Sequence, residues 1–165
     1  MHHLKFETER LFIEPMTKED TDFIYQLVNT EGWLKNIGDR KVNTKEEATA
    51  YIEKIVNNSN YTYLVFKQKE NQQPLGLVTL IKRDYLEDYD IGFAILPEFE
   101  KKGFAYEASQ KLMEIIETEN ICTKVFAITL PENSPSILLI KKLGLTYVNE
   151  IHEDNETLSV YQKVF

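Results

Sequence analysis

Apolar residues alternate with polar ones in some stretches of the chain and recur at helical spacing in others, which predicts both strands and helices. Alternation or a short apolar run predicts seven strands, at 10–15, 61–68, 74–83, 88–96, 124–130, 145–152 and 157–165. Helical spacing predicts four helices, at 17–30, 45–57, 103–119 and 134–144. The order of these elements predicts an α/β (α+β) fold: one mixed, mostly antiparallel, twisted sheet of about seven strands, flanked by helices.

Local signals mark the ends of several of these elements. Thr44 and Glu47 have the spacing of a capping box at the start of the second helix. Ser134 is placed to cap the last helix, and Gly144 stands at its stop. The polar turn 69–73 joins two β-rich runs and predicts a hairpin.

Length and composition favour a single domain over residues 1–165. No repeat and no Pro/Gly/Ser-rich linker divides the 165 residues, which suffice for a sizeable core. No segment approaches the roughly 20 apolar residues of a membrane span, so no membrane partner is expected. The N-terminus lacks the apolar stretch of a secretory signal, and the single cysteine, Cys122, has no internal partner. We therefore expect a cytoplasmic protein.

Charge and reactive residues exclude several classes of function. The net charge of −8 argues against a nucleic-acid partner and is compatible with a cationic substrate without requiring one. His2, His3 and His152 lack the spacing of metal ligands, so no metal is expected. The sequence contains no nucleophile elbow or catalytic cysteine motif, and Cys122 is interpreted as structural or inert.

The turn 97–103 has the chemistry of an anion cradle. It connects a strand to a helix that begins near Gly103, and the first N–H groups of a helix lack intrahelical partners and carry partial positive charge. Gly103 lets a phosphate approach the backbone, while Lys101 and Lys102 add positive charge. A plain polar turn before a helix accounts for the same residues, so this turn alone leaves both interpretations open.

Three segments together carry a resemblance to a known family. The stretch IGFAILPEFEKKGFAYEAS resembles the acetyl-coenzyme A loop of the GNAT superfamily of N-acetyltransferases, Gln/Arg-x-x-Gly-x-Gly/Ala after a strand and a proline turn. TERLFIEP and NSPSILLIKKLGL resemble segments of the branch that includes ribosomal-protein N-terminal acetyltransferases. Arg10, in the first of these, is interpreted as structural, pairing its strand to the sheet. The resemblance covers nearly the whole chain and implies the GNAT fold.

The resemblance implies acetyl-coenzyme A (acetyl-CoA) as co-substrate and direct transfer of its acetyl group to a primary amine in a ternary complex. It assigns the pyrophosphate to the loop residues Lys101, Lys102, Gly103, Phe104, Ala105 and Tyr106. The pantetheine arm is expected along the backbone near Phe93 and Ile95, where strand 88–96 splays from strand 124–130. Asn133 matches a family asparagine that contacts this arm or orders its helix start, and a simple turn residue is the alternative.

Catalytic and acceptor residues follow from the same resemblance. Asp90 stands where many relatives have a glutamate and would accept the proton of the amine, through water; a solvated or ion-paired carboxylate is the alternative, and Glu87 is the second candidate. Ser136 would donate a hydrogen bond to the leaving thiolate, or else bond to the backbone of its own helix. Asp39 and Arg40 lie in the region that lines the acceptor side in relatives, and would touch the substrate or order their loop.

Three positions depart from the family pattern. Glu100 replaces the usual Gln or Arg of the loop, and Leu145 replaces the usual Phe after the late glycine. Ile140 stands where many members have a tyrosine that protonates the thiolate. These departures keep a second hypothesis open, a non-catalytic GNAT-fold module that binds coenzyme A as a sensor or contacts a partner protein. The sequence also leaves open whether the amine belongs to a protein N-terminus or a small molecule, and whether the protein is a monomer or a homodimer.

Overall fold

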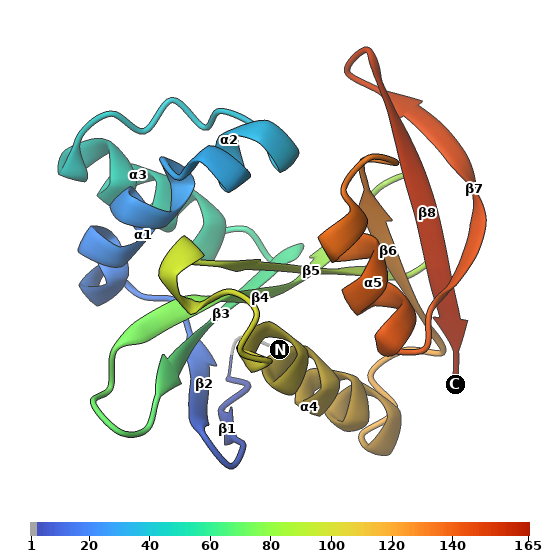
Figure 1. Ribbon diagram of the computed structural model, residues 1–165, viewed down its shortest axis with the longest axis horizontal. Helices are drawn as coiled ribbons and strands as arrows, with labels where there is room; N and C mark the ends of the chain where they lie inside the picture. Colours follow the sequence, from blue (N-terminus) through green and yellow to red (C-terminus); the bar gives the residue numbers. More distant parts are fainter. Residues whose placement is uncertain (1–2) are drawn as a thin grey trace.

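One open sheet of eight strands runs through the protein, in the order β1-β2-β3-β4-β5-β6-β8-β7 (Figure 1). The structure is a computed structural model that describes residues 3–165, so His2 lies outside the described residues. The strands are β1 (Phe6–Glu7), β2 (Leu11–Pro15), β3 (Tyr61–Gln68), β4 (Pro74–Lys82), β5 (Tyr89–Ile95), β6 (Lys124–Thr129), β7 (Thr146–Glu153) and β8 (Glu156–Val164). Only β5 and β6 are parallel neighbours among these strands, so the mixed, mostly antiparallel sheet is confirmed.

Helices cover both faces of the sheet (Figure 1). The described residues form the helices α1 (Thr21–Val28), α2 (Glu31–Asn36), α3 (Lys45–Val56), α4 (Phe104–Thr118) and α5 (Ser134–Lys142), with the 3-10 turns η1 (Lys18–Asp20) and η2 (Pro97–Phe99). Helices α1–α3 lie on one face and α4 and α5 on the other. None of these helices has the length and apolar character that crossing a membrane requires.

Alternation along the strands divides the core into two clusters. On β4, Val78 and Leu80 are buried on the side of α4 and α5, whereas Leu77 is buried on the side of α1–α3. The same alternation on β5 directs Ile91 toward α4 and α5, and Ala94 toward α1–α3. The sheet is therefore packed on both faces, and the two faces offer different surroundings to any group bound at its centre.

Strands β5 and β6 diverge after a short paired stretch, as Figure 1 shows. They pair only at Tyr89 with Val125 and at Asp90 with Phe126. Beyond this point β5 remains paired with β4 as far as Ile95, and β6 remains paired with β8. Within residues 3–165, no strand pairs with the β6-facing edge of β5 over residues 91–95, which we call the open edge.

The structure adds two elements to those predicted. Strand β1 is two residues long, too short to show alternation, and makes the sheet eight-stranded rather than about seven-stranded. Helix α2 has six residues, one of them Gly32, so it lacks a helical repeat; the Thr30 side chain caps it. The predicted helix 17–30 is shorter than expected, because a 3-10 turn occupies its first residues and α1 ends at Val28.

Two predicted caps differ from the observed ones. The cap of α5 is Asn133 rather than Ser134, because Asn133 has the non-helical backbone and its side chain accepts the N–H of Ser136. At α3 the Thr44 side chain accepts the N–H of Glu47, as the capping box predicts. The Glu47 carboxylate, however, accepts the N–H of Asn43 instead of that of Thr44. The predicted stop of α5 is confirmed, with Gly144 in the left-handed region at φ 92°.

Candidate active site

Helix α4 begins without a side-chain cap. Gly103 occupies the N-cap position at φ 83° and has no side chain that could accept a hydrogen bond from the first turn. The first intrahelical bond runs from the N–H of Glu107 to the carbonyl of Gly103, at 3.0 Å. The N–H groups of Phe104, Ala105 and Tyr106 therefore have no intrahelical acceptor. A helix start with such free N–H groups and a helix dipole behind it can bind an anion.

The turn before α4 brings the predicted loop residues together. Lys101, Lys102 and Gly103 are all exposed, and Lys101 also has a left-handed backbone, at φ 60°. The ammonium of Lys102 lies 5.8 Å from the centre of the Phe99 ring. The side chain of Glu100 is exposed as well, so its charge is solvated.

The open edge of β5 leads directly into this turn. Phe93 and Ile95 are half-buried and pack against the core on the α4–α5 side, while their backbone lies on the open edge. An extended ligand could bind this backbone as an additional strand, because unpaired N–H and C=O groups of an edge accept such pairing. Residues 97–102 then connect the open edge to the uncapped start of α4.

Asp90 lies where β5 and β6 part, and its carboxylate is buried with a side-chain exposure of 6%. The Nε of Arg83 donates to its Oδ2 at 2.7 Å, and the backbone N–H of Ile128 on β6 donates to the same carboxylate. Burial raises the pKa of Asp90 to about 6, although the Arg83 charge and both hydrogen bonds oppose this rise. Asp90 is therefore ion-paired in this structure, which is the alternative to its role as a base. The ion pair does not use all the lone pairs of the carboxylate, so the remaining ones can still accept a proton.

The second candidate for the base lies in other surroundings. Glu87 has a side-chain exposure of 73% and forms an ion pair with Lys124. It precedes Tyr89, the first residue of β5 that pairs with β6, so it stands at the closed end of the split. Cys122 is half-buried, and burial raises the pKa of its thiol to about 11, which makes the thiolate scarce near neutral pH.

Sequence reasoning missed a row of three residues on the α1–α3 side, two of them with hydroxyl side chains. Tyr63, Thr79 and Gly92 are direct cross-strand neighbours on β3, β4 and β5. A β-carbon at Gly92 would lie 2.7 Å from the Oγ1 of Thr79, so the hydroxyl occupies the space that a side chain would take. Alternation in 61–68 places Tyr63 on this face, but the sequence does not reveal which residues lie opposite it.

One of the two predicted acceptor residues, Arg40, lies near the Tyr63 end of this row. Burial raises the pKa of Tyr51 on α3, whereas the Arg40 guanidinium beside its hydroxyl opposes the rise. Burial also raises the pKa of Tyr63, whose hydroxyl neighbours that of Tyr51. Asp39 accepts the N–H of Lys41 at 2.7 Å, so it orders its own loop. The exposed Arg40 is the charged group of this loop that reaches the tyrosines.

At the start of α5, Ser136 and Asn133 are adjacent in space. The Asn133 Oδ1 accepts the N–H of Ser136 at 3.4 Å, so the amide oxygen closes the helix start. Within residues 3–165 no hydrogen bond from the Ser136 hydroxyl is found, and the side chain is half-buried. The hydroxyl is therefore available to a ligand. Ile140 is buried with an exposure of 1%, so an aliphatic side chain fills the position at which many relatives have a tyrosine.

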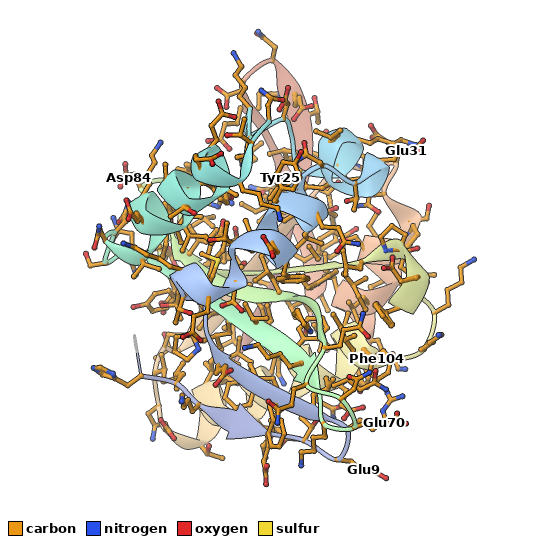
Figure 2. All side chains as sticks on the ribbon, turned by 90° about the vertical axis from the view of Figure 1, so that its left-hand side faces the viewer. Glu9, Tyr25, Glu31, Glu70, Asp84 and Phe104 are labelled. Carbon is orange, nitrogen blue, oxygen red and sulfur yellow. The ribbon has the colours of Figure 1, made fainter. Side chains whose placement is uncertain are left out.

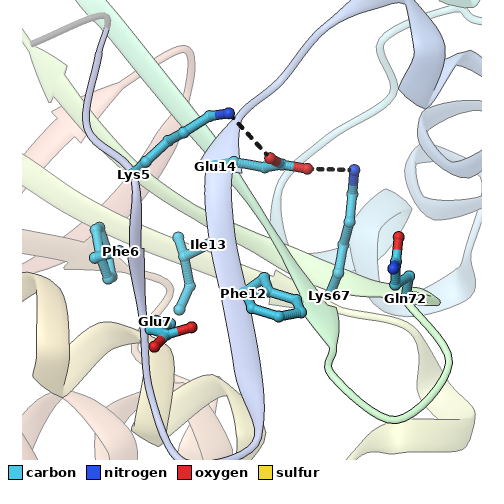
Figure 3. Close-up of a pocket in the computed structure, with 8 residues that line it drawn as sticks. All are labelled: Lys5, Phe6, Glu7, Phe12, Ile13, Glu14, Lys67 and Gln72. Atoms are coloured by element: carbon cyan, nitrogen blue, oxygen red, sulfur yellow. Dashed lines mark hydrogen bonds and ion pairs between the residues drawn. The ribbon is translucent and has the colours of Figure 1, made fainter.

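A depression at the other end of the sheet has a different character. It lies along β1, β2 and β3, and Figure 3 shows its charged side chains joined by dashed lines. Glu14 pairs with Lys67 at 2.8 Å and with Lys5 at 3.6 Å, and Lys67 also pairs with Asp20 at 3.5 Å. These charges neutralise one another and fasten the edge strands to η1. We therefore assign this depression a structural role.

Comparison with known proteins identifies the family. The model of the acetyltransferase (GNAT) domain matches residues 10–146. The chain belongs to the GNAT acetyltransferase family. Membership supports acetyltransferase activity with acetyl-CoA as the donor, and the mixed α/β fold around one open sheet agrees with it.

Individual relatives support the same assignment. The chain is 28% identical over 138 residues to the uncharacterized N-acetyltransferase YnaD of Bacillus subtilis (strain 168). The matched region covers 84% of this chain and 80% of YnaD. A GNAT-family acetyltransferase from Bacillus anthracis has a TM-score of 0.83 at 22% identity and covers 98% of both chains. The ribosomal L7/L12 alpha-N-protein acetyltransferase RimL, solved with coenzyme A, has a TM-score of 0.85 at 12% identity over 98% of both chains. At these identities the two structures show that the fold is shared.

Proposed function

We propose that this GNAT protein transfers the acetyl group of acetyl-CoA directly to a primary amine, of a protein N-terminus or of a small molecule. The observation that most supports this is the continuity of two binding features. The open edge of β5 runs without a break into the turn 97–103 and the uncapped start of α4. One feature suits an extended amide-containing arm and the other a pyrophosphate, which are joined in coenzyme A.

The donor would be held mainly by backbone groups. The N–H groups of Gly103 to Tyr106 would donate to the pyrophosphate, with Lys101 and Lys102 adding positive charge. The backbone at Phe93 and Ile95 would pair with the pantetheine arm, and the amide nitrogen of Asn133, which its cap leaves free, would donate to the same arm. Bound acetyl-CoA supplies the thioester carbonyl that a neutral amine attacks.

The acceptor would approach from the α1–α3 side. Asp90 and Gly92 alternate with Ile91 and Phe93, so they face this side while the apolar residues face α4. Arg40, Tyr51 and Tyr63 would line the acceptor's entry. Asp39 would contribute indirectly, by ordering the loop that carries Arg40.

Two side chains of this chain would move protons. The Asp90 carboxylate would take a proton from the ammonium form of the amine through a water molecule, and its raised pKa suits a base near neutral pH. The Ser136 hydroxyl would donate a hydrogen bond to the departing thiolate. The enzyme needs no covalent nucleophile for this route, which agrees with the raised thiol pKa of Cys122.

A thiol-release assay with a panel of amines tests the proposal. The purified protein is incubated with acetyl-CoA and with peptides that have free N-termini, polyamines or amino acids, and mass spectrometry identifies the acetylated product. Peptides with blocked N-termini and no lysine are the matched controls. We expect amine-dependent release above the rate without amine. Tight binding of coenzyme A with no acetylated product from any amine would instead favour the non-catalytic module.

The base is tested by the pH dependence of kcat/KM. The carboxylate form of Asp90 is the active one, so activity should fall as the pH falls through about 6, the pKa of this carboxyl. In Asp90→Asn this acid limb should disappear together with most of the activity. Glu87→Gln is the control and should retain the limb. If the limb persists in Asp90→Asn at the same pH, another group is the base.

A further inference from the structure

Glu107, in the first turn of α4, accepts three hydrogen bonds from one short segment near the N-terminus. The Oγ1 of Thr8 donates to its Oε1 at 2.5 Å, and the backbone N–H of Arg10 donates to the same oxygen at 2.9 Å. The Nε of Arg10 donates to Oε2 at 2.7 Å. Both carboxylate oxygens are thus bound by residues almost a hundred positions away in the chain.

Arg10 lies against the last two residues of the turn, Lys102 and Gly103, and against Phe104, the first residue of α4. Its Nη1 donates to the carbonyl oxygen of Lys102 at 3.1 Å. Its guanidinium carbon lies 4.2 Å from the centre of the Phe104 ring, and its Nη2 would lie 3.4 Å from a β-carbon at Gly103. Figure 2 shows Phe104 near the two turns marked by Glu9 and Glu70, at the end of the molecule where this segment lies.

The turn that Arg10 holds has two left-handed residues, and this backbone is unfavourable for the one that is not glycine. Lys101 has a φ of 60°, and Gly103 has a φ of 83°. A non-glycine residue persists in the left-handed region only when its surroundings hold it there. The hydrogen bond to the Lys102 carbonyl lies between these two residues and therefore restrains both.

The charges of this network favour the same geometry. Burial raises the pKa of Glu107, but the hydrogen bonds from Thr8 and Arg10 and the Arg10 charge outweigh it, so the pKa lies below its usual value. The ionised carboxylate points at residues 8–10, between β1 and β2, rather than at the free N–H groups of its own helix. If it turned toward them, it would compete with an anionic ligand for the same donors.

We propose that Arg10 and Glu107 are positioning residues for the donor: with Thr8 they lock the turn 101–103 and the first turn of α4 into the shape that presents free N–H groups to the pyrophosphate. The identity of this ligand rests on the function proposed above. The network itself touches only protein atoms, so its effect on the reaction is indirect. We call it the Arg10–Glu107 latch.

Conservative variants test the latch with two readouts. Arg10→Lys retains the positive charge but cannot reach the carboxylate and the Lys102 carbonyl together, and Glu107→Gln retains the shape but removes the charge. In calorimetric titrations of coenzyme A, we expect the Kd to rise about three- to tenfold in each, the effect of one partly exposed charge-assisted hydrogen bond. The KM for the amine should not change. If the latch only stabilised the fold, the variants would lose activity without a specific rise in the Kd for coenzyme A.

The matched control lies on β2, the strand that begins directly after Arg10. Glu14 accepts a hydrogen bond from Lys67 and does not contact the turn. Its side-chain exposure is 35%, against 20% for Glu107. Glu14→Gln should leave the Kd for coenzyme A unchanged. If Arg10→Lys and Glu107→Gln alter the Kd no more than Glu14→Gln does, the latch proposal is wrong.

Amide hydrogen exchange without any ligand gives the second readout. The amides of residues 101–105 should exchange faster in Arg10→Lys and Glu107→Gln than in the wild type or in Glu14→Gln, because the turn opens more often. Unchanged exchange there would contradict the proposal. This measurement also tests the latch separately from the proposed function. If the wild type bound no coenzyme A, the proposed function would be wrong, but the exchange rates would still show whether the latch holds the turn.

Discussion

Helices α3 and α4 both have a glutamate in the first turn, but this acid helps to close the start of α3 and leaves the start of α4 open. At α3, Thr44 accepts the N–H of Glu47 at 3.1 Å, and Glu47 accepts the N–H of Asn43 at 2.6 Å, so the acid serves its own helix start. At α4, the cap is Gly103 and the acid of the first turn, Glu107, binds Thr8 and Arg10 in the distant connection between β1 and β2. A side-chain cap stabilises a helix by about 1 kcal/mol. The longer helix forgoes this stabilisation and retains free N–H groups, which a closed start cannot offer to a ligand.

The largest effect on coenzyme A binding is expected at Gly103, because the uncapped start of α4 depends on the left-handed backbone of this residue. Gly103→Val places a β-branched residue at φ 83° and puts its β-carbon 3.4 Å from the Nη2 of Arg10. We expect coenzyme A binding to weaken by more than about 100-fold, with a stability loss of roughly 1–3 kcal/mol from the strain. Calorimetric titration and thermal unfolding measure the two effects.

A second glycine provides the control for this variant. Gly144, after the end of α5, has a φ of 92°, so Gly144→Val introduces comparable strain outside the turn 97–103. It should lower stability to a similar extent without weakening coenzyme A binding selectively. Tight binding by a folded Gly103→Val protein would contradict the assignment of the turn.

The start of α5 is a third case, because it is capped by Asn133 and yet has the Ser136 hydroxyl available to a ligand. Ser136→Ala should lower kcat about 10- to 100-fold, the scale of one proton-transfer contact, with little change in coenzyme A affinity. Ser134→Ala, at an exposed position of the same turn, is the control. Unchanged turnover in Ser136→Ala with a good acceptor would exclude a chemical role for this hydroxyl.

The closed start of α3 should respond only in stability. Thr44→Ala removes the acceptor for the Glu47 N–H and should lower the free energy of unfolding by about 1 kcal/mol. Urea unfolding measures this loss, and calorimetry should find the same Kd for coenzyme A as in the wild type. A large change in that Kd would mean that α3 and the donor site are coupled.

The smallest effect is expected from the charge beside the open start. Glu100 is exposed, so its carboxylate is screened from a nearby phosphate by solvent. Glu100→Gln should leave the Kd for coenzyme A unchanged or lower it by less than about threefold. A marked weakening of binding would show that this acid makes a contact in the complex.

Much of the fold follows from local patterns. The hairpin of β3 and β4, the glycine stop of α5 and the boundaries of most strands agree with the sequence because alternation, turns and caps act over a few residues. The glycine at the start of α4 is local as well, and the family motif marks it. Even so, the sequence suggests only that Gly103 makes room for a phosphate, whereas the structure adds a left-handed backbone and the contact with Arg10.

The rest of the site depends on residues far apart in the chain. Nothing in the sequence near Glu107 indicates that it will bind Arg10, 97 positions away, or that Arg83 and Ile128 will hold the Asp90 carboxylate. Tyr51 and Tyr63 likewise meet only because α3 packs on β3. Such contacts are set by tertiary packing, which single-residue patterns do not encode.

The position of β8 between β6 and β7 has a consequence for how the chain acquires its fold during synthesis. Strands β1 to β5 are neighbours in the order in which they are made, so they can pair while the remainder is still being translated. Strand β6 must wait, because its antiparallel partner is residues 156–164, near the end of the sequence shown. Until those residues emerge from the ribosome, the edge of β6 that β8 later covers would stay unpaired. At this stage the nascent chain is prone to aggregation.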